Sequence, residues 1–68
     1  MTLNEKIGKR ITELRKSKDK TLEKLAYESG ISKGGLSEIE RGLREARIST
    51  INKICETLEI KLNEFFNF

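Results

Sequence analysis

Two short apolar segments, joined by only a few residues around Gly30, Ile31 and Ser32, most constrain the fold of this 68-residue chain. Leu25 and Ala26 lie in the first segment, and Gly30 and Ile31 follow after four residues. So few linking residues force two helices to cross steeply. A small side chain is then needed where they meet, and Ala26 provides it. Gly30 leaves the first helix with a positive φ at little cost. The undersides of both helices are formed by Leu25, Ile31, Leu36 and Ile39.

The rest of the chain repeats apolar residues at helical spacing. Within each segment, apolar residues recur three or four positions apart, which is typical of amphipathic helices. No segment alternates with period two, so we expect an all-α domain without a sheet. The chain contains no linker or repeat that would divide it, so residues 1–68 form one domain. The pattern predicts helices over about 3–17, 22–29, 33–41 and 48–58, and one or two further turns around 62–66.

Residues that cap helices lie at the expected boundaries. Thr2 with Glu5 matches a capping box, and Thr21 and Ser32 precede the second and third helices. Gly30 ends the second helix, and Gly42 ends the third.

The composition excludes several classes of function. The chain has no histidine and one cysteine, so we expect no zinc site, no intrachain disulfide, no cofactor and no enzymatic activity. Cys55 lies among apolar positions and is predicted to pack in the core. Apolar runs never exceed two residues, which predicts no membrane span and no signal peptide, and hence a cytoplasmic protein.

The positive charge is concentrated in the first two thirds of the chain. Residues 1–47 hold 12 Lys and Arg against 8 Asp and Glu, whereas residues 48–68 hold 2 against 3. An anionic partner is therefore expected to meet the first two thirds.

The chain resembles the Cro/C1-type (XRE) family of helix-turn-helix repressors. The segments IGKRITELRKSKDKTLEKLA, SGISKGGLSEIERG and STINKICETLEIKLNEFF carry the resemblance. It implies a compact five-helix, lambda-repressor-like DNA-binding domain with the helix-turn-helix at about 21–42. It also implies that the third helix enters the major groove of double-stranded DNA, and that Arg15 and Glu40 form an ion pair.

The placement of the third helix suggests which side chains face DNA. The predicted base contacts are Ser32, Lys33, Gly34, Ser37 and Glu38. Lys33 could donate to guanine, and Glu38 could accept from cytosine N4. Alternatively, Ser32 is only a cap, Glu38 faces solvent and Lys33 contacts phosphate. The predicted backbone contacts are Arg15, Thr21, Arg41, Arg44 and Arg47.

Two adjacent glycines in the third helix are costly, because each destabilises a helix by about 1 kcal/mol relative to alanine. Gly34 and Gly35 could allow close approach to a groove wall or a thymine methyl. The alternative is a tolerated defect.

Departures from the family pattern limit what the resemblance implies. Leu22 replaces a phosphate-binding Gln, Ser29 replaces an apolar residue, and Ala46 replaces a loop proline. Arg47 and Lys61 stand where a capping serine is common.

One recognition helix reads too few base pairs to select a site, so we expect a homodimer on an inverted repeat. The predicted interface comprises Leu62, Phe65, Phe66 and Phe68. Alternatively, Phe65 and Phe66 complete the monomer core and Phe68 frays. The leading function is a sequence-specific transcriptional regulator, most simply a repressor. The alternative is an antitoxin or another protein-interaction module. The shortness of the tail beyond the bundle argues against this alternative.

Overall fold

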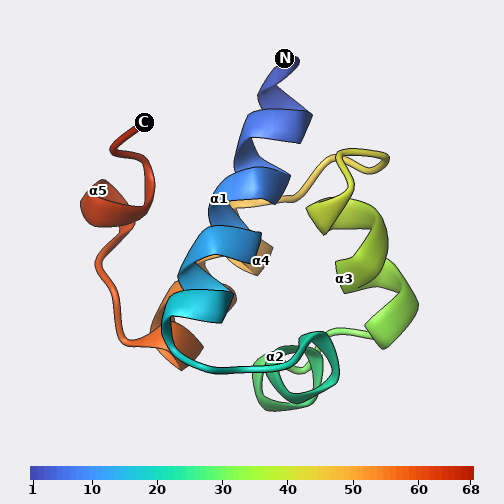
Figure 1. Cartoon of the computed structure of the whole chain (residues 1–68), viewed down its shortest axis with the longest axis vertical. Coiled ribbons are helices and arrows are strands. Elements are labelled where there is room, and N and C mark those ends of the chain that lie inside the picture. The colour runs from blue at the N-terminus through green and yellow to red at the C-terminus, as the bar shows by residue number, and fades with distance from the viewer.

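The computed structural model describes all residues, 1–68, and contains five helices and no strand (Figure 1). Their bounds are Leu3–Ser17 (α1), Leu22–Ser29 (α2), Lys33–Glu40 (α3), Ile48–Leu58 (α4) and Leu62–Phe65 (α5). The predicted all-α class and order of helices are confirmed. Two helix ends differ by one residue: Arg41 is the C-cap of α3 and Phe66 is the C-cap of α5, and neither is part of its helix.

The predicted caps are present. The Thr2 side chain accepts a hydrogen bond from the Glu5 amide, and the Glu5 carboxylate accepts one from the Thr2 amide, which completes the capping box. These bonds to Thr2 lower the pKa of the Glu5 carboxyl. By contrast, the N-cap residues of α4 and α5 are Arg47 and Lys61, and neither side chain makes a capping hydrogen bond.

The crossing of α2 and α3 follows the steric prediction. Gly30 has a φ of 70°, and Ala26 is 2% exposed beneath the crossing. Figure 1 shows α2 nearly end-on while α3 runs across the view, so the two axes meet at a steep angle. Helix α3 therefore packs on α1 and α2 through one face and leaves its opposite face open.

The core is one cluster contributed by all five helices. It contains eleven buried residues: Ile7, Ile11, Leu25, Ala26, Leu36, Ile39, Ile51, Ile54, Cys55, Leu58 and Phe65. The apolar spacing places Ile48 in one stripe with Ile51 and Ile54 of α4, but Ile48 is 63% exposed. It occupies the first position of α4, and Ile51, a turn further on, is the first residue of that stripe to be buried.

Gly8 allows α1 to approach α3 more closely than any other residue would. A Cβ at Gly8 would lie 2.3 Å from the Ile39 carbonyl oxygen and 2.5 Å from that of Glu40. Both are main-chain atoms and cannot swing aside. No local pattern indicates this close approach, because Gly8 lies inside a helical pattern.

Ser29, which replaces an apolar residue of the family pattern, is buried with its hydroxyl satisfied. Its Oγ donates to Thr57 Oγ1 over 2.9 Å, and Thr57 donates in turn to the carbonyl of Lys53. A buried hydroxyl with a partner avoids most of the desolvation cost. The substitution therefore joins α2 to α4 through a polar contact.

Candidate nucleic-acid interface

The N-termini of α2 and α3 are capped in the same way. Thr21 Oγ1 accepts from the Lys24 amide, and Ser32 Oγ accepts from the Gly35 amide. The capping role considered for Ser32 is thus confirmed. The remaining amide groups of each first turn carry the positive end of the helix dipole, which favours an anion such as phosphate.

The outward face of α3 holds the predicted base-contacting residues. Lys33 and Gly34 are exposed and Ser37 and Glu38 are half-buried, whereas Leu36 and Ile39 point into the core. An α-helix with its side chains is about 10–12 Å in diameter, so it fits into the DNA major groove, which is about 12 Å wide. The fold therefore collects these side chains on one accessible surface of a helix that could enter the groove.

The two adjacent glycines of α3 have different environments. A Cβ at Gly34 would meet nothing within 4 Å, so the fold does not require glycine there. A Cβ at Gly35 would lie 2.8 Å from Ser32 Oγ and 3.5 Å from Nη1 of Arg44. Gly35 therefore leaves room for the cap of its own helix.

Two ion pairs lie on this face. Lys33 Nζ is 3.6 Å from Glu23 Oε1, and Arg44 Nη2 is 2.7 Å from Glu38 Oε1. All four side chains are more than two fifths exposed. Such pairs contribute only about 0–1 kcal/mol to stability, so these cations are available to a partner.

The three arginines after α3 differ in what they contact. Arg41, Arg44 and Arg47 are all exposed. Arg41 Nε donates to the carbonyl of Ser37 over 3.4 Å, Arg44 pairs with Glu38, and Arg47 has no ion pair. Their predicted phosphate contacts stay predictions, and Arg47 is the least engaged of the three.

Arg15 has a structural role. Its Nε and Nη2 donate to the two carboxylate oxygens of Glu40, and its Nη1 donates to the carbonyl of Lys20. The side chains of the pair are 12% and 8% exposed. The ion pair implied by the resemblance is confirmed. The predicted phosphate contact of Arg15 finds no support in this geometry, because most of the guanidinium is occupied and covered.

The predicted dimer interface is divided between core and surface. Phe65 is fully buried, as the alternative stated, and offers no surface to a partner. Leu62, Phe66 and Phe68 are 38%, 39% and 55% exposed, and we call these three residues the tail patch. The ring of Phe65 meets those of Phe66 and Phe68 edge-on, with centroids 4.9 and 6.4 Å apart.

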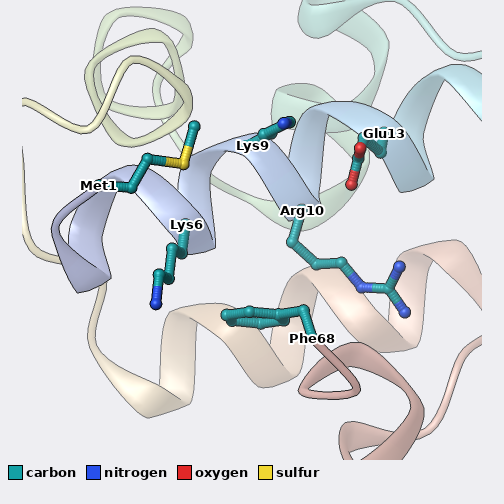
Figure 2. A pocket seen from close by; sticks show the side chains of 6 residues that line it. All are labelled: Met1, Lys6, Lys9, Arg10, Glu13 and Phe68. Carbon is teal, nitrogen blue, oxygen red and sulfur yellow. The ribbon is translucent and has the colours of Figure 1, made fainter.

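A shallow groove of about 270 Å³ separates α1 from the tail. Figure 2 shows the ring of Phe68 below α1, with the side chains of Lys6 and Arg10 on either side. Arg10 reaches beyond the groove and binds main-chain carbonyls of α5. Sequence reasoning missed Arg10, because no local pattern indicates a contact across more than fifty residues.

No alternative chemical site is evident. No group of three or more His, Cys, Asp or Glu residues is placed to hold a metal ion, and no helix is long and apolar enough to cross a membrane. Cys55 is buried in the core as predicted, and burial raises the pKa of its thiol.

Comparisons with known proteins agree with this geometry. The HTH_3 helix-turn-helix family model matches residues 11–65. The HTH-type transcriptional regulator SlrR of Bacillus subtilis (strain 168) is 42% identical over 62 residues, covering 90% of this chain and 41% of SlrR. This chain thus spans about two fifths of the length of that relative.

Several solved structures are similar to this chain over nearly its whole length. The restriction-modification controller protein C.AhdI from Aeromonas hydrophila has a TM-score of 0.89 and 35% identity, covering 93% of this chain and 91% of C.AhdI. The nucleoprotein complex C.Esp1396I has a TM-score of 0.87 and 33% identity, covering 97% of this chain and 86% of the matched chain. The chain belongs to the HTH_3 family of helix-turn-helix transcriptional regulators, the XRE type that its sequence resembled. Its five-helix fold is that of these DNA-binding regulators.

Proposed function

We propose that this protein is a sequence-specific transcriptional regulator that binds an inverted-repeat operator as a homodimer and represses transcription there. The open outward face of α3 is the observation that carries the proposal. It presents Lys33, Ser37 and Glu38 beside two capped helix N-termini. Bases are distinguished by donors and acceptors in the major groove, and these side chains supply both.

Phosphate contacts would fix the position of α3 on the duplex. The first turn of α2 offers free amides behind Thr21, and Arg41 and Arg47 lie exposed after α3. Such contacts add affinity without reading sequence, and they make binding fall with salt. In this arrangement α3 would read the base sequence and its flanks would bind phosphate, which together provide the specificity and the affinity that a regulator needs.

Dimerisation would use the tail patch. Leu62, Phe66 and Phe68 leave apolar surface on one end of the molecule, away from α3 (Figure 1). Two copies joined there would present two α3 helices, and helix-turn-helix dimers bind half-sites about 34 Å apart. A dimer bound over a promoter would exclude the polymerase, which is the simplest route to repression.

Selection of bound duplexes from a random pool tests the proposal. We expect an enriched inverted repeat, bound with two copies of the chain. Lys33→Ala should relax the preference at one position of each half-site, whereas Arg47→Ala should weaken all duplexes about equally and flatten the salt dependence. Failure to enrich any sequence at low salt would refute the function.

A further inference from the structure

The loop after α3 turns back and brings Arg44 alongside the helix that it has just left. Gly42, with a φ of 74°, reverses the chain at the end of α3. The Leu43 amide then donates to the carbonyl of Glu38 over 2.9 Å. This bond fixes the start of the loop against α3, so residue 44 begins next to the last turn of the helix.

The side chain of Arg44 also lies against α3. Its Nη2 lies 2.7 Å from Oε1 of Glu38, and its Nη1 lies 3.5 Å from the position that a Cβ on Gly35 would occupy. The guanidinium therefore lies along α3, over Gly35 and Glu38. A Cβ at Gly35 would make only ordinary van der Waals contact with this nitrogen, so the guanidinium packs directly over the backbone of α3.

The pairing changes what Glu38 can do near DNA. A free carboxylate approaching a duplex is repelled by the phosphates and rotates among several orientations. The pair that it forms with Arg44 is neutral overall, and Oε1 is occupied while Oε2 has no partner in the structure. An oxygen held in this way accepts a hydrogen bond from an exocyclic amine, such as N4 of cytosine, in the major groove.

We propose that Arg44 is a positioning residue for Glu38, and that the pair together sets the base preference at one position of each half-site. This inference rests on the proposed function. The exposed pair is weak in water, but a duplex displaces water from around it, and the lower local dielectric strengthens the attraction. Arg44 thus differs from Arg47, which has no carboxylate partner and contributes affinity alone.

The experiment compares Glu38→Gln, Arg44→Gln, the double variant and the matched control Arg47→Gln. Each is titrated against the duplex selected by the wild-type chain, and against one in which the base read by Glu38 is changed. The wild-type chain should prefer the selected duplex by roughly tenfold, since one good base contact discriminates by about 1–3 kcal/mol. Glu38→Gln and Arg44→Gln should each reduce that ratio to about twofold, and the double variant should reduce it no further.

The control separates the two roles of an arginine. Arg47→Gln should weaken both duplexes by the same factor and leave the ratio unchanged. If Arg44→Gln behaves in the same way, with the wild-type ratio preserved, Arg44 is only a phosphate contact and the inference is overturned. If the wild-type chain selects no duplex, the proposed function itself fails. Thermal unfolding of each variant verifies that these exposed substitutions leave the fold intact.

Discussion

Arg10 of α1 holds the carbonyl group of Phe65, which lies 55 positions later in the chain. Its Nε donates to the Phe65 oxygen over 2.8 Å, and its Nη2 donates to the carbonyl of Glu64 over 2.7 Å. These carbonyls belong to the last residues of α5 and have no partner inside so short a helix, although the Glu64 carbonyl also accepts from the Asn67 amide over 3.2 Å. A single guanidinium thus ties the tail to the body of the domain and sets the direction of the tail patch.

Arg10→Met should release the tail while keeping the aliphatic part of the side chain. Loss of two charge-assisted hydrogen bonds should lower the free energy of unfolding by about 1–3 kcal/mol. Lys9→Met removes the same charge from the neighbouring position, whose side chain makes no hydrogen bond or ion pair, and should change stability by less than about 0.5 kcal/mol. Urea unfolding monitored by circular dichroism measures both. Equal stability of the two variants would contradict the assigned role of Arg10.

Phe66→Ser combined with Phe68→Ser should weaken the dimer and leave the monomer folded, because neither ring is fully buried. Sedimentation equilibrium should show a dissociation constant raised at least about tenfold, since each aromatic anchor in an interface contributes on the order of 1 kcal/mol or more. Tyr27→Ser, at the most exposed large side chain, is the control. A wild-type chain that is monomeric at high concentration, or a double variant that dimerises as well as the wild type, would rule out the tail patch as the interface.

Helix limits and the helix-turn-helix crossing were predictable because their causes are local. The caps at Thr2, Thr21 and Ser32 bond to amides three residues away, and Gly30 acts on its own φ. The distribution of the aromatic residues was not predictable in this way. Whether Phe65 is buried depends on the position of α5 relative to the rest of the core, which no nearby residue determines.

Glu40→Ala should be among the most destabilising substitutions outside the apolar core. It leaves the guanidinium of Arg15 buried without its carboxylate, and removes the acceptor that Thr12 Oγ1 approaches within 2.9 Å. Breaking one side of a buried pair costs about 3–5 kcal/mol, whereas replacing both sides with apolar residues is often neutral. We therefore expect Arg15→Met with Glu40→Leu to recover most of the lost stability. A double variant as unstable as Glu40→Ala would show that the pair itself stabilises the fold.

Gly34→Ala and Gly8→Ala should have opposite effects on stability. The Cβ at residue 34 meets open space, so improved helix propensity should stabilise the protein by up to about 1 kcal/mol. The Cβ at residue 8 meets main-chain carbonyls, and overpacking should cost about 1–3 kcal/mol. Thermal unfolding distinguishes the two. Operator affinity of Gly34→Ala then tests whether DNA needs the space, since equal or tighter binding would exclude a close-approach role.

Cys55 should be unreactive in the folded protein. Burial raises the pKa of its thiol, and the thiolate is the reactive form. Because folding favours the protonated thiol, its contribution to stability is present below the thiol's unfolded pKa and is lost as pH rises through the raised folded value. Alkylation by iodoacetamide at pH 8 should therefore follow global unfolding. Rapid labelling of the native protein would contradict the placement of Cys55 in the core.

Some pairings at the site had no signal in the sequence. Glu23 approaches Lys33, and Arg44 reaches Glu38, only because α2, α3 and the following loop converge in space. Gly8 lies inside a helix, and only the proximity of α3 accounts for a glycine there. Pairings of this kind depend on the relative placement of helices, whereas a single sequence reports mainly on each helix by itself.

The residues that attach α3 to the body are not the residues that it turns outward. The helix is attached by Leu36, Ile39 and Glu40. The outward side chains, Lys33, Ser37 and Glu38, are not part of the buried core. Target preference can therefore be reprogrammed by exchanging outward side chains alone, with the scaffold and its melting behaviour left nearly unchanged. The domain can therefore serve as a scaffold for engineering, and libraries varied at those three positions should yield mostly folded proteins.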